Sequence, residues 1–492
     1  MFISLKLTAA HIMMIRVLLL LTLFTLLDCK GNSESEDGYV YFGGEIINPN
    51  NDYVVLNSPE DESDTLYLDQ NNRFFEKMPL AKAGLYTFIH GGEYQRILFE
   101  PSDSIMIRLN TIDFDESLVF TGNGARKNNY LIGVFVENES DNKKFMKLMW
   151  DMEPKKFEEV LIADREKKLA ELDQFLAQKE YSPLFKMIAK SNINYDYYYN
   201  KELYPFGYYG YNNLIHYKDL PEGFYDFRSD VEYNNEELAG VIPYYRFLFY
   251  HFNNLALGKY YETATHNVVF DNKSAVYNLE KLRLMDSLID SDKIKNHLLK
   301  YTTRDFVTVS QDSSEINEML SFYLQRSTSE SDKDYIKKLV SSVKRLKAGN
   351  VVPNIKLMDD KDNEVELVSL VKQPTLIYFW SSNLPMLLRN SHYKVKSLKS
   401  KFPQMDFIGI NINDDDKTHW ETTLTQYKFP TTDEYRFVDS KEAMNDLAIN
   451  SVNRSILVDK DGKIITSNAM IFTSEFEDEL AQLLQTKKLT NK

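Results

Sequence analysis

TLIYFWSSNLPMLL, residues 375–388, is the stretch that decides the fold of this chain. Its first six residues form a continuous apolar run of strand length, which is typical of a strand buried on both faces. Residues 381–383 break the run, and a segment follows in which Val395, Leu398 and Phe402 recur at helical spacing. The stretch therefore predicts a buried strand, a turn and a helix.

Strand and helix patterns alternate on both sides of this stretch. Strands separated by helix-length segments predict a sheet that contains parallel strands, and a final hairpin around Lys460-Asp461-Gly462 adds an antiparallel edge. Asp459 to Gly462 starts like a calcium loop, but the acid expected near its twelfth position is missing, so a turn is predicted. The predicted strands are 355–358, 365–367, 375–380, 405–411, 456–459 and 463–465, with helices through Val395, Trp420 and Phe476.

Three segments in order resemble thioredoxin-like proteins of the TlpA and peroxiredoxin-related group, over residues 348–488. They are Ala348 to Ile355, Leu376 to Ser382 and Ile456 to Ile464. The resemblance implies a thioredoxin fold. It also implies a Trp-Cys-x-x-Cys turn at a helix N-terminus, where the helix end lowers the pKa of the first thiol.

The cysteines that this resemblance requires are missing. Aligned from Phe379-Trp380 without a gap, their two positions fall on Leu384 and Leu387. The family's cis-proline position, six residues before Asp459, falls on Asn453. A cis bond before a non-proline residue costs about 3 kcal/mol, so we expect the substrate-docking bend to be lost as well. No catalytic residue and no cofactor is predicted. Leu384, Leu387 and Asn453 then form an apolar binding face, or the two leucines simply start a packed helix.

Cys29 is the only cysteine in the chain, so no internal disulfide is possible. If Cys29 is acylated, the mature protein contains no thiol. Reductase, isomerase and peroxidase mechanisms that begin from a protein thiolate are then excluded.

The N-terminus predicts export and a lipid anchor. Arg16 precedes an eleven-residue apolar run, Val17 to Leu27, which has the length of a signal-peptide core and is too short to span a bilayer. Cys29 follows at the place where bacterial lipoproteins carry their modified cysteine, before a polar tether at 31–37, although Asp28 is unusual there. The alternative is a free cysteine near an ordinary cleavage site.

Residues 38–124 predict a small antiparallel β domain, because short apolar runs alternate with turn clusters such as Pro101-Ser102-Asp103. They also resemble the uncharacterised β-rich domain that precedes thioredoxin-like domains in bacterial envelope lipoproteins. The resemblance rests on Phe42 to Ile46, Leu98 to Ile105 and Phe120 to Gly124.

Residues 125–347 predict helices that end before Gly349. Two apolar stripes at helical spacing support this, namely Ile162, Leu169, Leu172 and Leu176, and Ile336, Leu339, Val343 and Leu346. Tyrosines crowd residues 195–217, and such a cluster either packs between helices or stacks a sugar or peptide.

Composition excludes several classes of function. The net charge of -15 argues against a nucleic-acid partner. The eight histidines form no zinc motif, and no phosphate loop or dinucleotide motif is present. His419 beside Asp414, Asp415 and Asp416 either holds a hard cation weakly or marks a solvated turn. No metal site is predicted.

These observations predict a multidomain α+β protein: a lipid-anchored cell-envelope lipoprotein whose thioredoxin fold is redox-inactive and serves as a binding or scaffold module for a protein or peptide. The alternatives are an enzyme with a non-thiol site in the helical middle region, and a thiol-disulfide oxidoreductase by homology. We expect a signal peptide at 1–28, a tether at 29–37, a β-rich domain at 38–124, a helical region at 125–347 and a thioredoxin-like domain at 348–488.

Replacing Cys29 with Ser tests the anchor. Each buried methylene of an acyl chain contributes about 0.8 kcal/mol to membrane binding, so loss of the acylated cysteine should move the protein out of the membrane fraction. A variant that partitions unchanged on membrane fractionation would contradict the lipid anchor.

Overall fold

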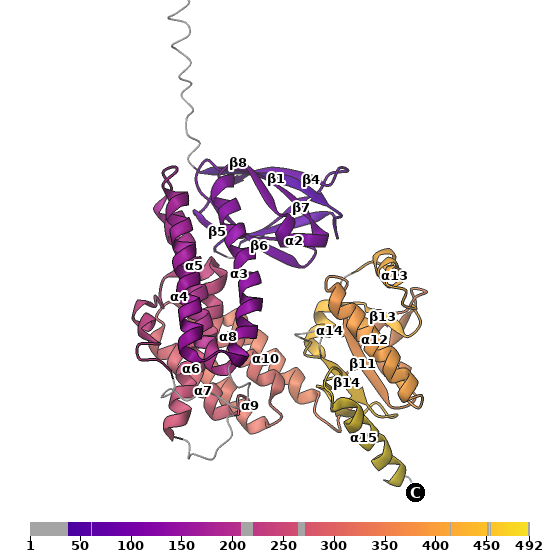
Figure 1. The fold of residues 1–492 in the computed structure, drawn as a ribbon. Helices are drawn as coiled ribbons and strands as arrows, with labels where there is room; N and C mark the ends of the chain where they lie inside the picture. The colour runs from indigo at the N-terminus through magenta and orange to yellow at the C-terminus, as the bar shows by residue number, and fades with distance from the viewer. Residues whose placement is uncertain are drawn as a thin grey trace, which may run out of the picture. The chain divides into compact units, whose positions relative to one another are not determined.

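The computed structural model describes residues 38–60, 62–207, 220–263, 271–413, 415–449, 452 and 454–490. Strands come first, helices follow, and strands and helices alternate in the C-terminal part. The predicted multidomain α+β architecture is therefore confirmed (Figure 1). The described residues divide into two compact units, one up to Val136 and one from Glu137 onward, and each is described by itself.

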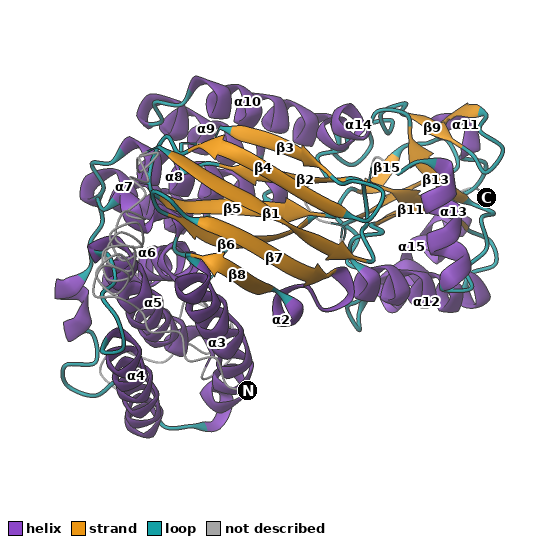
Figure 2. Ribbon diagram, turned by 90° about the horizontal axis from the view of Figure 1, so that it is seen from above, coloured by secondary structure: helices purple, strands orange, loops and turns teal. Residues whose placement is uncertain are grey.

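The first unit is a sandwich of two four-stranded sheets, ordered β4-β1-β7-β8 and β3-β2-β5-β6. Phe42, Phe88 and Phe99 are fully buried in the core that both sheets contribute to, and Figure 2 shows the strands of the sheets lying over one another. Neighbouring strands are antiparallel as predicted, except that β1 and β7 run parallel. The strands are β1 (Tyr39–Ile47), β2 (Tyr53–Asn57), β3 (Ser63–Tyr67), β4 (Arg73–Pro79), β5 (Gly84–His90), β6 (Glu93–Phe99), β7 (Ser104–Asn110) and β8 (Val119–Asn123), and the short helices η1 (Thr111–Asp113) and α2 (Phe114–Ser117) precede β8.

Two neighbouring asparagines at the start of α3 (Ala125–Asp151) cover an edge strand of each sheet. The side-chain oxygen of Asn128 accepts from the Leu98 N–H of β6 at 2.7 Å, and its amide donates to the Leu98 carbonyl at 3.0 Å. Asn129 makes the same pair of bonds to Phe120 of β8, at 2.9 and 2.8 Å. Each amide thus takes the place of a further strand, so these backbone groups are not left unpaired.

The second unit begins with a helical region. Its described helices continue from α3 as α4 (Pro154–Leu176), α5 (Pro183–Gly207), η3 (Asp226–Asp230), η4 (Glu236–Gly240), α6 (Ile242–Thr263), α7 (Ala275–Leu288), α8 (Asp292–Val309), α9 (Ser313–Arg326) and α10 (Glu330–Arg345). The predicted stripe on α4 was wrong at Ile162, which is 38% exposed, whereas Leu161 is buried. Gly349 has a φ of +91°, which suits the predicted glycine after the last helix.

The tyrosines of α5 pack between helices. Tyr195, Tyr198 and Tyr204 are almost fully buried, and the Tyr198 ring stacks on Phe227 with centroids 4.7 Å apart. The packing interpretation therefore applies to the tyrosines that the structure describes. Tyr208, Tyr209, Tyr211 and Tyr217 lie outside the described residues.

The C-terminal part is built on a seven-stranded sheet in the order β10-β9-β13-β12-β11-β14-β15. β11, β12 and β13 are parallel neighbours, and β14 with β15 forms the predicted antiparallel edge. The strands are β9 (Lys356–Met358), β10 (Glu364–Glu366), β11 (Thr375–Trp380), β12 (Asp406–Asn411), β13 (Glu434–Phe437), β14 (Ser455–Val458) and β15 (Ile464–Thr466). The helices are α11 (Leu367–Leu370), α12 (Pro385–Lys401), α13 (Lys417–Gln426), α14 (Ser440–Asp446) and α15 (Phe476–Thr490).

The sequence prediction missed β13 and α14. Leu376, Tyr378 and Trp380 of β11 share one core cluster with residues of α12 and α15, whereas Phe379 meets Phe437 of β13. The central strand is therefore buried on both faces, as its continuous apolar run predicts.

Replacing Asn128 with Ala should leave the buried N–H and carbonyl of Leu98 without hydrogen-bond partners. An unpaired buried polar group costs about 1–3 kcal/mol, so the Leu98 amide should exchange hydrogen about ten to a hundred times faster. Asn129→Ala is the matched control, since it should accelerate exchange at Phe120 instead. Unchanged hydrogen exchange at Leu98 in the Asn128 variant would show that the Asn128 side chain does not protect this edge strand.

Candidate functional site

The turn between β11 and α12 stands where the family resemblance implies the redox-active cysteines. Leu384 is the N-cap residue of α12 and is 43% exposed, while Leu387 lies half-buried in the first turn. Pro385 occupies the first helical position, where its missing N–H costs no intrahelical hydrogen bond. The structure thus places both predicted leucines at the start of the helix, and neither carries sulfur.

Serine and asparagine side chains hold this turn. The Ser382 N–H and hydroxyl both donate to the side-chain oxygen of Asn413, at 3.1 and 3.2 Å, and the Asn383 N–H donates to the Ser381 hydroxyl at 3.2 Å. In the part of the chain that the structure describes, neither serine hydroxyl is hydrogen-bonded to a histidine or carboxylate that could act as a base. Among the described residues, the turn therefore shows no base for a serine nucleophile.

A buried carboxylate, Glu434 of β13, lies among residues of β11 and α12. Tyr378 donates its hydroxyl to one carboxylate oxygen, and the Trp380 indole N–H donates to the other at 2.8 Å. His392 Nε2 lies 3.3 Å from the oxygen that Tyr378 contacts. Burial, and then the charge of Glu434, raise the pKa of Tyr378 well above its ordinary value, so the phenol stays a donor. The carboxylate of β13 thus bonds two side chains of β11 and lies beside a side chain of α12.

His392 is held by a hydrogen bond within α12. Its Nδ1 lies 2.8 Å from the Leu388 carbonyl, which can only accept, so Nδ1 carries a hydrogen. Nε2 makes no hydrogen bond among the described residues and lies 3.3 Å from the carboxylate oxygen of Glu434. The His392 ring is also stacked on Phe429, with centroids 4.3 Å apart.

Cys29 and Asn453 lie outside the described residues, but Arg454 follows Asn453 directly. The Arg454 guanidinium is buried and donates through Nε to the Ser467 carbonyl at 2.6 Å and through an Nη to the Ala448 carbonyl. Burial lowers the pKa of Arg454 to about 10. The guanidinium thus joins the backbone at Ala448 to the backbone at Ser467.

The acidic group beside His419 forms caps and local bonds. Asp416 accepts from the His419 N–H at 2.8 Å, and Asp415 accepts from the Asn411 side chain at 2.6 Å, whereas Asp414 is outside the described residues. Among the described residues, no three His, Cys, Asp or Glu side chains are grouped so that they could hold a metal ion. Asp459 accepts from the N–H groups of Asp461 and Lys463, as the predicted hairpin turn requires.

The helical region contains a chain of hydrogen bonds that resembles a catalytic triad. Tyr233 bonds His251 Nε2 at 2.6 Å, and His251 Nδ1 bonds the fully buried carboxylate of Glu202 at 2.7 Å. Arg228 binds both oxygens of Glu202, at 2.8 and 2.6 Å, and Asn254 donates to one of them.

The pKa shifts in this network indicate that it stabilises the fold rather than activating Tyr233 as a nucleophile. Burial, and then the charge of Glu202, raise the pKa of Tyr233 to about 12, which makes its phenolate scarce. Burial alone would raise the pKa of Glu202, but His251 and Arg228 outweigh it and lower that pKa. The carboxylate is therefore a fixed anion that joins α5, α6 and the segment before η4.

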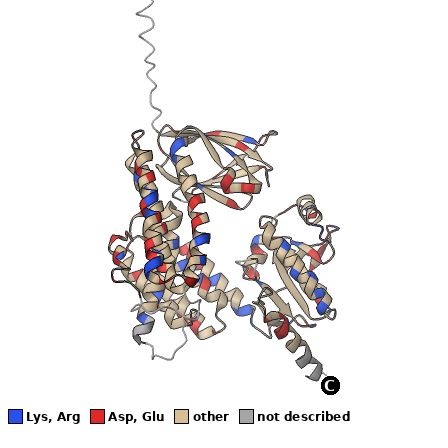
Figure 3. Cartoon of the chain, in the orientation of Figure 1, with Lys and Arg blue, Asp and Glu red and all other residues tan. Residues whose placement is uncertain are grey.

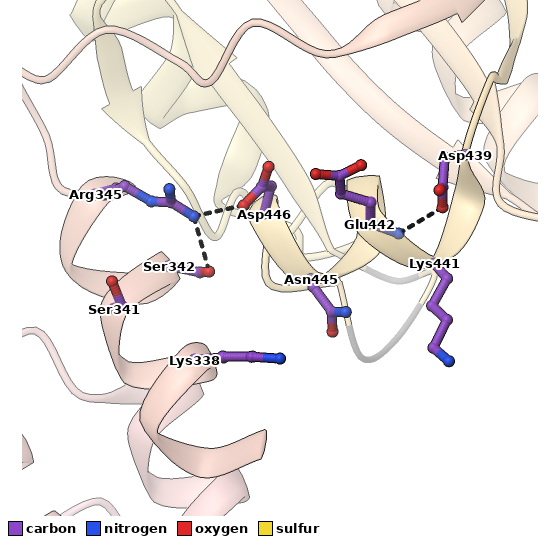
Figure 4. A pocket seen from close by; sticks show the side chains of 9 residues that line it. All are labelled: Lys338, Ser341, Ser342, Arg345, Asp439, Lys441, Glu442, Asn445 and Asp446. Carbon is purple, nitrogen blue, oxygen red and sulfur yellow. Dashed lines mark hydrogen bonds and ion pairs between the residues drawn. The ribbon is translucent and has the colours of Figure 1, made fainter. Parts of the chain in front are cut away.

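A groove of about 1010 Å³ lies over the β4-β1-β7-β8 sheet and is lined in part by Phe75 and Met106. A second groove, of about 480 Å³, lies between α10 and α14 (Figure 4). Charged side chains line it, and Arg345 of α10 pairs with Asp446 of α14 at 2.6 Å.

Comparison with known proteins identifies the fold of the C-terminal part. Residues 372–464 match a family model described as thioredoxin-like, so this domain is thioredoxin-like. None of the curated proteins matches the chain. Among the described residues, no helix is both long enough and apolar enough to cross a membrane.

Several solved structures are similar to part of the chain. The thioredoxin domain of a thiol-disulfide oxidoreductase from Bacteroides vulgatus is 21% identical, with a TM-score of 0.25, covering 28% of this chain and 98% of that one. A thiol-disulfide oxidoreductase from Bacteroides fragilis is 21% identical, with a TM-score of 0.23, covering 27% of this chain and 99% of that one. A thiol:disulfide interchange protein from Bacteroides sp. is 20% identical, with a TM-score of 0.24, covering 28% and 89%.

Replacing Glu434 with Gln should destabilise the thioredoxin-like domain. The amide nitrogen of Gln cannot accept a hydrogen bond, so either Trp380 or Tyr378 would face another donor and lose its acceptor. Breaking such a buried network costs about 3 kcal/mol, so the amides of β11 should exchange hydrogen about a hundredfold faster. Glu421→Gln is the control, since Glu421 is 43% exposed and 3.9 Å from Lys417. Equal exchange rates in both variants would contradict the role of Glu434.

Proposed function

We propose that the thioredoxin-like domain is a binding or scaffold module that exchanges no disulfides. The observation that carries this proposal is the identity of the residues at the start of α12, where Leu384 and Leu387 stand at the two cysteine positions. A thiol-disulfide exchange needs a thiolate that attacks a disulfide sulfur and a second thiol that resolves the mixed disulfide. The turn offers neither group.

The sequence excludes a pair of thiols anywhere in the chain. Cys29 is its single cysteine, so no second thiol can resolve a mixed disulfide, whichever residues align with the active-site turn. What the turn retains is an apolar surface at the end of the sheet, with Leu384 43% and Met386 65% exposed. Exposed large apolar side chains of this kind are typical of protein contacts.

The same proposal places the protein in the cell envelope, attached to a membrane by a lipid on Cys29. It rests on the apolar run of residues 17–27 directly before this cysteine and on the polar tether that follows. A peripheral binding module needs no membrane-spanning helix. The bound partner is then a protein or peptide at the membrane surface, and no cofactor is required.

A disulfide-reduction assay tests the missing chemistry. With dithiothreitol as the electron source, the full chain should reduce insulin no faster than buffer, because it has no thiol pair to relay electrons. Turnover by the unaltered protein would refute the proposal.

The double variant Leu384→Cys/Leu387→Cys is the matched positive control. It places two thiols at the spacing Cys-x-x-Cys at the N-terminus of α12, where the helix end lowers the pKa of the first thiol. We expect it to form a reducible disulfide and to reduce insulin above background. A folded but inactive double variant would show that more than sulfur is missing from the turn.

A further inference from the structure

The helix that follows the degenerate turn is strongly basic in an otherwise acidic protein. α12 contains five Lys or Arg residues and no Asp or Glu, whereas the whole chain has a net charge of -15. Figure 3 shows these cations along the helix. Three of them form ion pairs within the domain, because Lys394 and Lys401 share Glu477 of α15 and Lys399 pairs with Asp433.

The two remaining cations, Arg389 and Lys396, are exposed and have no ion pair in the part of the chain that the structure describes. They alternate along the helix with Met386, 65% exposed, and Tyr393, 58% exposed. Residues three and four apart share one face of a helix, so Met386, Arg389, Tyr393 and Lys396 form one continuous stripe, here called the α12 stripe.

The rings beside the stripe hold its side chains in place. The Arg389 guanidinium lies over the Tyr427 ring at 6.0 Å, and the Tyr393 ring meets Phe429 edge-on with centroids 5.5 Å apart. Side chains that are positioned before binding lose less conformational entropy when a partner arrives.

Further apolar side chains are exposed at the end of the sheet where the stripe begins. The Ala469 N–H bonds the Ser455 carbonyl at 2.9 Å, and Ser455 pairs with Tyr378 near the end of β11. The loop after β15 therefore lies at the same sheet end as the degenerate turn. It exposes Met470 by 51% and Phe472 by 46%.

We propose that the α12 stripe recognises an acidic amphipathic segment of a partner protein, in which apolar side chains alternate with Asp or Glu. This rests on the proposed function and names its partner class. The apolar members of the stripe would take the apolar side chains, and Arg389 and Lys396 would pair with the carboxylates. From Met386 to Lys396 the helix rises about 15 Å, which matches about five extended residues. An anionic bilayer is the other occupant that these cations could meet, and the experiment below distinguishes the two.

Fluorescence anisotropy on the full chain tests this proposal with short labelled peptides in which Leu and Phe alternate with Glu, with Lys or with Ser. The Glu peptide should bind about tenfold more tightly than the Lys peptide at low salt, and the preference should weaken as salt is added. The double variant Arg389→Glu/Lys396→Glu should reverse the order.

Lys372→Glu/Lys463→Glu is the matched control, since both lysines are exposed and lie at the other end of the sheet, beside the start of β11 and the β14-β15 turn. This variant changes the net charge equally and should keep the preference for the Glu peptide. Absence of binding, equal binding of all three peptides, or equal loss in both variants would overturn the proposal. Stripe-dependent binding to phosphatidylglycerol vesicles without peptide binding would also overturn it. These outcomes leave the redox-inactive function standing, because that function is tested by insulin reduction.

Discussion

The thioredoxin-like domain depends on the hydrogen bonds of one buried carboxylate, that of Glu434. It takes hydrogen bonds from Tyr378 and Trp380 of β11 and faces His392 of α12. A buried charge is tolerated only when it is paired and hydrogen-bonded. These partners therefore fix the position of the last residues of β11 relative to the second turn of α12. The orientation of the degenerate turn follows from this arrangement, and it needs no disulfide.

The absence of sulfur changes what such a turn can do. A cysteine pair at a helix N-terminus does chemistry because the helix stabilises a thiolate, whereas leucines at the same place present only apolar surface. Leu384, Met386, Met470 and Phe472 remain exposed at this end of the sheet. In our proposal this surface binds a partner, and the basic side chains on α12 add charge selectivity to it.

Sequence patterns predicted the elements whose hydrophobic signal is continuous. β11 has exactly the predicted bounds of 375–380, because every one of its residues is buried. β13 was missed, because Glu434 and Arg436 make the strand look polar. Glu434 is buried only because Tyr378 and Trp380, more than fifty residues away in the chain, supply its hydrogen bonds. No local pattern reports such partners. On α4, the ammonium group of Lys168 is buried because it pairs with Asp141 and Asp164. A charged residue therefore lies on the inward face of this helix, which the sequence pattern predicted to be apolar.

The central claim is that the chain holds no redox couple, and an equilibrium redox titration tests it most directly. The full chain would be incubated in glutathione buffers from fully reduced to fully oxidised, quenched with acid and weighed by intact-protein mass spectrometry. We predict the same mass at every potential, apart from one glutathione adduct on Cys29 in any chains that are not acylated there. Loss of two hydrogen masses within one chain, following a two-electron transition, would contradict the account.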